Sequence, residues 1–397
     1  MSSKAKKGDV LLDIKGLHIE GFSDEKWHEI IKGIDLTLHR GEVMGLIGES
    51  GAGKSTLGLA AMGYTQPGCR ITGGKITFDG ADLMDLSDVE MRSYWGNRMT
   101  YVAQSAAASF NPAHRLIEQT TSSTIRFGIK DRAEAYKDAH QLYAALNLPD
   151  PDRIGDRYPH QVSGGQLQRV MTAMAMSPRP DLIIFDEPTT ALDVTTQVEV
   201  LSSMRAIVEE FNTAAIYITH DLAVVAQMAD VIKVLRYGEE VEEADTRKML
   251  KSPKEAYTKS LWSVRALQKE TQKPSEAIMS LRGIDAAYGS AKVLFGVDIE
   301  VPRGSTVAVV GESGSGKSTT ARVITGLLPQ SSGTVLFDGA ELSTRLADRS
   351  KEQKRRIQMI YQMADTAMNP RQTVRDIIGR PLEFYLGIRG KANTDRV

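Results

Sequence analysis

A glycine-rich motif that occurs twice constrains the fold of this 397-residue chain more than any other feature. Residues 41–56 read GEVMGLIGESGAGKST, and residues 304–319 read GSTVAVVGESGSGKST. A second match follows in the same order, because ITFDGADL at 76–83 resembles VLFDGAEL at 335–342. Collinear matches at nearly constant offset indicate a duplicated domain rather than two chance motifs.

The repeat predicts a first domain over residues 10–250, a polar, lysine-rich connector with some helix over 251–278, and a second domain over 279–397. The second copy stops before the positions that match the later motifs of the first. Extrapolating the repeat, we expect a native chain of roughly 530–550 residues.

Short β-branched runs alternate with helical stretches in the first copy and predict an α/β fold. The runs are VMGLIG (43–48), LIIFD (182–186), AAIYITH (214–220) and VIKVL (231–235). Runs that are apolar throughout are typical of strands buried on both faces of a mostly parallel sheet. Residues 87–175 lack them and predict a helical insert. Each glycine-rich motif also follows an apolar segment that we expect to be a strand.

The composition narrows the classes of function. The net charge of −1 gives no overall reason to expect nucleic acid as a partner. The single cysteine, Cys69, excludes an internal disulfide and a cysteine-ligated metal centre. No run of about 18 apolar residues is present, so we expect no segment that spans a bilayer. Work at a membrane would therefore require docking on another protein.

The repeated motif has the spacing G-x(4)-G-K-S, at Gly48–Ser55 and Gly311–Ser318. Glycines let backbone amides turn toward phosphate oxygens, and a helix that begins directly afterwards adds its positive end. Lysine neutralises the β- and γ-phosphates, and the serine hydroxyl is a ligand for Mg²⁺. The candidate ATP-binding residues are Gly48, Glu49, Ser50, Gly51, Ala52, Gly53, Lys54, Ser55 and Thr56, with Gly311, Glu312, Ser313, Gly314, Ser315, Gly316, Lys317, Ser318 and Thr319.

Two carboxylates stand at the end of the run at 182–186. Asp186 ends the predicted strand, where it can reach a Mg²⁺ ion held by Ser55. Glu187 comes next and points elsewhere, which suits a base that orients the attacking water. Solvated carboxylates at a strand end would look the same in isolation, but a preceding phosphate loop favours the catalytic interpretation.

Two further polar residues stand near strand ends. His220 ends the predicted strand 214–220 and could hydrogen-bond the γ-phosphate or the water, although such a histidine is usually structural. Gln104 precedes a loop-like stretch and recurs as Gln362 in the second copy at nearly the same distance from the motif. This recurrence favours a functional role, which a single glutamine would not indicate.

VSGGQLQRV at 162–170 completes a set of motifs that resembles the ATP-binding subunits of ABC transporters. The resemblance implies P-loop NTPase domains of the ABC ATPase type, with an antiparallel β part beside the parallel sheet, duplicated and with the second copy incomplete. It also implies ATP hydrolysis with Mg²⁺ as cofactor. The signature, Ser163, Gly164, Gly165 and Gln166, would face the γ-phosphate bound by the opposite domain. Serine and two glycines before a helix form an anion site on physical grounds as well.

The resemblance assigns further roles. Asp193 resembles the residue of the loop that couples the two ATP sites, while Gln104 and Gln362 resemble residues that sense the membrane subunit and contact Mg²⁺ or water. The metal ligands would therefore be Ser55, Gln104, Asp186, Ser318 and Gln362.

An aromatic residue upstream of each phosphate loop should stack on adenine. Tyr288 fits this place in the second copy, and Phe22 fits it in the first, with Trp27 as a competitor. A role in the core is about equally consistent with the sequence for these side chains.

YPHQVSGGQLQRVMTAMAM and EAYTKSLW resemble the importer ATPases for dipeptides, oligopeptides and nickel. The resemblance implies a peripheral protein on the cytoplasmic face of the inner membrane. Its partners would be two integral membrane permease subunits and, through them, a solute-binding protein, with no nucleic acid. A soluble tandem ATPase that acts on ribosomes is the alternative.

The second copy departs from the family pattern. It carries a phosphate loop and Gln362, but no signature, base or histidine follows before Val397. Because ATP in this family lies between domains paired head to tail, we expect no complete site within one chain. Two first domains that pair head to tail are the alternative arrangement.

Overall fold

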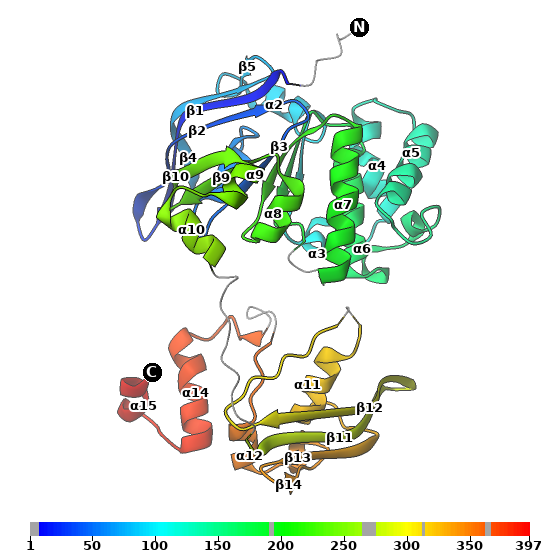
Figure 1. Cartoon of the computed structure of the whole chain (residues 1–397), viewed down its shortest axis with the longest axis vertical. Coiled ribbons are helices and arrows are strands. Elements are labelled where there is room, and N and C mark those ends of the chain that lie inside the picture. The colour runs from blue at the N-terminus through cyan, green and yellow to red at the C-terminus, as the bar shows by residue number, and fades with distance from the viewer. Residues whose placement is uncertain (1–7, 190–193, 264–274, 312–313, 362–366) are drawn as a thin grey trace. The chain divides into compact units, whose positions relative to one another are not determined.

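The computed structural model describes residues 8–189, 194–263, 275–311, 314–361 and 367–397 (Figure 1). It consists of two compact units, Met1–Gln268 (unit 1) and Lys269–Val397 (unit 2). Asp193, Glu312, Ser313 and Gln362, all singled out by the sequence, lie outside the described residues.

Unit 1 contains two sheets. The six-stranded sheet has the order β10-β9-β3-β8-β7-β6, and every neighbouring pair in it is parallel except β10 with β9. The second sheet is antiparallel, with the order β2-β1-β4-β5. The strands are β1 (Val10–Ser23), β2 (Lys26–His39), β3 (Val43–Ile47), β4 (Cys69–Phe78), β5 (Ala81–Asp82), β6 (Met99–Val102), β7 (Leu182–Asp186), β8 (Ala214–Ile218), β9 (Val231–Arg236) and β10 (Glu239–Asp245).

Helices of unit 1 pack on the parallel sheet, and most of the chain between β5 and β7 is helical. They are α1 (Lys54–Ala60), α2 (Asp88–Tyr94), α3 (Ala106–Ser109), α4 (Leu116–Arg126), α5 (Arg132–Ala145), α6 (Gly164–Met176), α7 (Val194–Glu210), α8 (Leu222–Met228), α9 (Thr246–Lys251) and α10 (Ala256–Ser263). Within the described part of the chain, no helix combines the length and the apolar character needed to cross a membrane.

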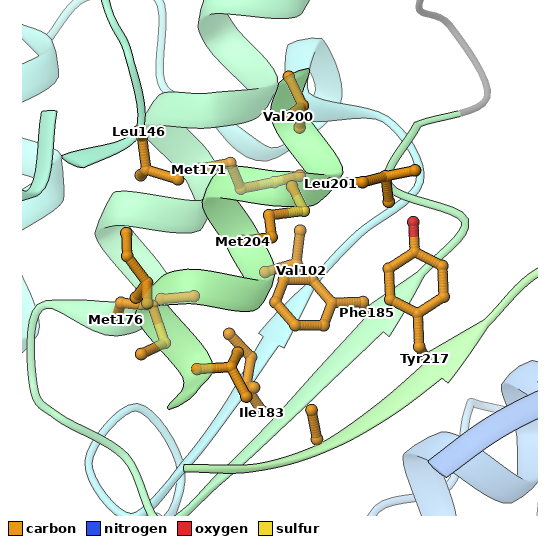
Figure 2. Packing of buried hydrophobic residues seen from close by; sticks show 14 of the residues in the cluster. Val102, Leu146, Met171, Met176, Ile183, Phe185, Val200, Leu201, Met204 and Tyr217 are labelled. Carbon is orange, nitrogen blue, oxygen red and sulfur yellow. The ribbon is translucent and has the colours of Figure 1, made fainter. Parts of the chain in front are cut away.

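Side chains that alternate along the central strands supply two cores. On β7, Ile183 and Phe185 face the cluster formed with the helices, whereas Leu182 and Ile184 face the cluster shared with the antiparallel sheet. Figure 2 shows Ile183, Phe185 and Tyr217 of the strands in one cluster with methionines of α6 and α7. Every residue of β7 is buried, which explains why its first four residues, LIIF, form a continuous apolar run.

The predicted α/β class, its mostly parallel sheet and its antiparallel part are confirmed. The prediction that residues 87–175 are mainly helical misses β6, which pairs in parallel with β7 at the edge of the sheet. Its four residues, MTYV, are too few for periodicity to distinguish a strand from part of a helix.

A cluster of four charges joins the two sheets of unit 1. Arg40 donates to Asp79 at 2.5 Å and to Asp181 at 2.9 Å, and Arg98 donates to the same carboxylates at 2.5 and 2.7 Å. Burial acts to raise the pKa of Asp79, but hydrogen bonds from Arg98 and Arg40 outweigh it and lower that pKa. The cluster fixes the antiparallel sheet, through Asp79, to the starts of β6 and β7.

Unit 2 repeats the antiparallel part of unit 1. Its sheet has the order β12-β11-β13-β14, and the pairing of Leu281 with Val335 matches that of Ile14 with Ile76. Its elements are β11 (Ala277–Tyr288), β12 (Ala291–Pro302), α11 (Lys317–Thr325), β13 (Ser332–Phe337), β14 (Ala340–Glu341), α12 (Lys351–Arg356), α14 (Val374–Leu386) and α15 (Lys391–Arg396).

Charged groups also link the strands of unit 2. Asp338 accepts from both Arg303 and Arg356, which repeats three of the four charges of the unit 1 cluster. At the other end of the sheet, a hydrogen bond from Lys292, supported by the Gly296 amide and the Ser332 hydroxyl, lowers the pKa of Asp285 to about 2.

The apolar segment before the second phosphate loop is not a strand, contrary to the prediction. Residues 306–310 form no regular element, and the side chain of Val310 is 87% exposed. In unit 1 the equivalent β3 is hydrogen-bonded to β8 on one side and β9 on the other. The described residues of unit 2 contain no strand that pairs with 306–310, and a strand without neighbours leaves its backbone groups unsatisfied.

Candidate functional site

The phosphate loop of unit 1 connects β3 to α1. Gly53 caps the helix with φ +92°, and a Cβ there would lie 2.6 Å from Ile31, so the turn requires glycine. Lys54 begins α1, and its Nζ donates to the carbonyls of Gly48 and Glu49 at 2.9 and 2.8 Å. The loop therefore wraps around the ammonium group of its own lysine.

Lys54 is only 6% exposed. Burial lowers its pKa, against the negative charges of Glu187 and Asp186, which act to raise it. A buried cation inside a loop of backbone dipoles forms a preorganised environment for phosphate oxygens.

Asp186, at the end of β7, is 8% exposed and has a different partner on each oxygen. The hydroxyl of Ser55 donates to Oδ1 at 3.0 Å, and the hydroxyl of Tyr101 donates to Oδ2 at 2.6 Å. Burial and the adjacent carboxylate raise the pKa of Tyr101, so its hydroxyl stays protonated and donates. The sequence predicted that Asp186 and Ser55 lie together. It did not point to Tyr101, because strand β6, which carries Tyr101, was not predicted.

Glu187 lies between the two polar residues that the sequence placed near strand ends. Gln104 Nε2 donates to Glu187 Oε2 at 3.2 Å, and His220 Nδ1 lies 3.0 Å from Glu187 Oε1. The backbone of Glu187 has φ +47°, which is uncommon without glycine, and its amide donates to Ile218 of β8. This conformation turns Glu187 away from the direction of Asp186.

These side chains line one open cavity of about 600 Å³. Loop, strand ends and Gln104 contribute its lining, which is Ser50, Gly51, Gly53, Lys54, Ser55, Thr56, Gln104, Asp186, Glu187 and His220. A cavity of this size is ample for a small-molecule ligand such as a nucleotide polyphosphate. One cation, two carboxylates and a histidine thus converge on the space in front of the loop.

The Ser163–Gln166 segment lies at the start of α6 and is not part of the cavity lining in unit 1. Ser163 is the N-cap: its Oγ accepts from the Gln166 amide at 3.3 Å, and Gln166 Oε1 accepts from the Ser163 amide at 3.1 Å. Ser163 and Gly164 are exposed. Gln168, one turn further, donates to the carbonyl of Ala103 beside Gln104 at 3.3 Å.

Two aromatic side chains lie at the tip of the β1–β2 hairpin. Phe22 and Trp27 are cross-strand partners with ring centroids 5.3 Å apart, and both are exposed. Gly21, next to Phe22, packs against Ile30, whose carbonyl lies near Gly53 of the phosphate loop. The hairpin end therefore borders the loop.

The second phosphate loop has the same turn. Gly316 caps α11 with φ +96°, and Lys317 Nζ donates to the carbonyl of Gly311 at 2.7 Å. Tyr288 is 42% exposed, and its hydroxyl accepts from Arg322 of α11 at 2.8 Å.

Helix α10, in the predicted connector, contacts the first phosphate loop. The amide of Glu49 donates to the hydroxyl of Tyr257 at 3.2 Å, and the guanidinium of Arg236 lies 4.5 Å from the Tyr257 ring centroid. Glu242 accepts from the amides of Lys254 and Glu255, just before the helix, at 2.9 and 3.0 Å. The sequence offered no signal for this contact, since 208 residues separate its partners.

Comparisons with known proteins agree with this geometry. A family model described as ABC transporter matches residues 31–190 and 294–396. The glutathione import ATP-binding protein GsiA of Salmonella choleraesuis (strain SC-B67) is 31% identical over 432 residues, which cover 98% of this chain and 69% of that protein. GsiA of Escherichia coli (strain K12) is 30% identical over 445 residues, or 100% of this chain and 71% of that protein.

A solved structure adds support for the fold. The ATP-binding cassette MJ0796, a dimer in a post-hydrolysis state bound to ADP and Pi, is 26% identical with a TM-score of 0.54. The similarity covers 60% of this chain and 99% of that chain.

Proposed function

Because this chain belongs to the ATP-binding proteins of ABC transporters and is an ATPase, we propose that it drives an importer for small peptides or related solutes, glutathione among them. The observation that carries the proposal is similarity to glutathione import proteins over 98% of this chain. The cavity that unites Lys54, Asp186 and Glu187 supports it.

The geometry of unit 1 supports Glu187 as the base that orients the attacking water. Gln104 and His220 each hold one of its oxygens, so the carboxylate has a fixed direction before any nucleotide binds. His220, whose side chain is 60% exposed, is free to contact a γ-phosphate as well. Lys54 supplies positive charge at the same place and would bind the β- and γ-phosphates.

The residues of the site fit a Mg²⁺ ion. Ser55 Oγ and Asp186 Oδ1 lie 3.0 Å apart, and Gln104 adds an amide oxygen, all of them hard oxygen donors of the kind that Mg²⁺ prefers. When bound, the ion would neutralise phosphate charge during phosphoryl transfer. We include Ser318 as the equivalent ligand in unit 2.

The signature at Ser163–Gln166 would complete a phosphate loop on another ATPase domain. Ser163 and Gly164 are exposed and lie outside the unit 1 cavity, as a group that serves a different domain requires. The dimeric state of MJ0796 with ADP and Pi supports pairing of two ATPase domains, for which we propose a head-to-tail arrangement. Turnover that rises more than linearly with protein concentration is the expected result for the isolated chain.

The proposed partners are two membrane permease subunits and, through them, a solute-binding protein, with this chain on the cytoplasmic face. Gln104 and its loop, held to α6 by Gln168, are suited to pass a movement between ATP and a permease. The ribosome-acting alternative is not favoured, since the relatives reported above are import proteins.

Reconstitution tests the proposal. The chain would be combined with candidate permease subunits in liposomes, and uptake of labelled glutathione or dipeptide would be followed with ATP inside or outside the vesicles. We expect uptake only when ATP is on the side of this chain, and none with the Glu187→Gln variant. Binding to ribosomes with no permease-dependent change in ATPase rate would overturn the importer assignment.

A further inference from the structure

A tyrosine that the sequence motifs pass over lies against the second oxygen of Asp186. Tyr101 is on β6 and pairs with Ile184 of β7, so Asp186, two residues further along β7, is on the same face of the sheet. A residue placed diagonally on the adjacent strand is within reach of an aromatic side chain. Its hydroxyl accordingly donates to Asp186 Oδ2 at 2.6 Å.

We propose that Tyr101 is a positioning residue that fixes the carboxylate of Asp186 for the divalent cation bound with ATP. The inference rests on the proposed cation-dependent ATP site of unit 1. It assigns a role to a side chain that is not among the residues lining the cavity.

The two hydroxyls divide the carboxylate between them. Ser55, from the phosphate loop, holds Oδ1, and Tyr101, from the adjacent strand, holds Oδ2. Rotation of the Asp186 side chain would break both bonds. If Ser55 turned to become a cation ligand, Tyr101 would still hold the carboxylate in place with Oδ1 directed to the loop. Partners of this kind orient metal-binding carboxylates and affect metal affinity strongly.

Strand β6 also connects the proposed cation site at Asp186 with Glu187, the proposed base that orients the attacking water. It carries Tyr101, which holds Asp186, and leads within three residues to Gln104, which holds Glu187. Gln168 of α6 binds the carbonyl of Ala103 between them. Displacement of this strand would therefore disturb both carboxylates together.

The experiment measures how far a divalent cation strengthens ATP binding, separately from turnover. Variants of the 397-residue chain would carry Lys317→Ala, so that the signal comes from unit 1. The probe is a non-hydrolysable fluorescent ATP analogue, whose Kd is measured in EDTA and in saturating Mn²⁺. The ratio of the Kd in EDTA to the Kd in Mn²⁺ reports how far the bound cation strengthens ATP binding.

Tyr101→Phe is compared with Tyr143→Phe as a matched control. Tyr101 is partly buried and Tyr143 is fully buried; the hydroxyl of Tyr143 is 2.7 Å from that of Thr120, and neither Tyr143 nor Thr120 lines the cavity. We expect Tyr101→Phe to leave the Kd in EDTA within about twofold and to lower the ratio roughly tenfold or more, while Tyr143→Phe changes neither.

Two results would overturn the inference, and they differ from each other. An equal ratio in all variants, or a higher one in Tyr101→Phe, would make Tyr101 a structural residue only, while the ATP site stands. A ratio of one without either tyrosine change would mean that no cation is held with ATP, which refutes the proposed site itself.

Discussion

Replacing Glu187 by glutamine tests the site most directly, because the change keeps the shape of the side chain and removes only its charge and basicity. The carboxylate is 18% exposed, and both of its oxygens have polar partners that an amide can also satisfy. We therefore expect the fold and the cavity to be retained. A missing general base lowers turnover by about 10²–10⁴-fold, or about 3–5 kcal/mol of barrier.

ATP binding should survive this change or become tighter. Glu187 is a negative charge in the same cavity as Asp186, and a triphosphate adds more negative charge there. Neutralising Glu187 removes part of this repulsion. The assay pairs phosphate release at saturating ATP with equilibrium binding of a fluorescent ATP analogue.

Glu42 provides a matched control. Its Oε2 lies 2.9 Å from His39 Nδ1, and its side chain is 20% exposed, so the pair resembles Glu187 with His220 but lies at the start of β3. Glu42→Gln should keep full turnover. If Glu187→Gln retains more than about a third of the wild-type rate, or if Glu42→Gln loses as much, Glu187 is not the base.

Three further predictions concern binding and stability. In a Lys317→Ala background, Lys54→Ala should weaken ATP binding about 10–100-fold, because a charge-assisted contact to phosphate is lost, and unchanged equilibrium binding would refute this role of the loop. Arg40→Met should lower the free energy of unfolding in urea by about 2 kcal/mol, since Arg40 is nearly buried between two carboxylates, whereas the half-exposed Arg70→Met should cost about 0.5 kcal/mol or less, and equal losses would contradict the cluster. The pKa of Asp285 is lowered to about 2 in the folded chain, so its stabilisation is complete above about pH 4 and is lost as the pH falls toward 2. Thermal melting of wild type and Asp285→Asn should therefore converge in that range, and parallel pH profiles would argue against it.

The sequence predicts those parts of the fold that depend on patterns along one strand or loop. Strand β7 is buried throughout, so its four apolar residues followed by the acidic pair Asp186 and Glu187 were informative. The glycine turn at Gly53 recurs at Gly316 with nearly the same φ, as the repeated motif requires. Local chemistry decides both features.

Contacts between distant segments were not predictable in the same way. The bond from Tyr101 to Asp186 depends on the pairing of β6 with β7, and the short run MTYV gives no periodic signal. The four-charge cluster depends on the approach of two sheets, although each of its residues looks like an ordinary surface charge. The prediction of a strand at 306–310 was wrong for the opposite reason. The apolar pattern there is correct for a strand, but a strand also needs neighbouring strands to pair with.

The contact of Tyr257 with the Glu49 amide determines where the chain can be divided for expression. A recombinant fragment that stops at residue 250 would lack this contact, and it would uncover the part of the core on which Leu261 and Trp262 of α10 pack. A fragment that continues through Ser263 keeps the helix and its hold on the phosphate loop. Fusions, tags and protease sites should therefore be placed after α10, whose sequence looks like a spacer but belongs to the nucleotide-binding unit.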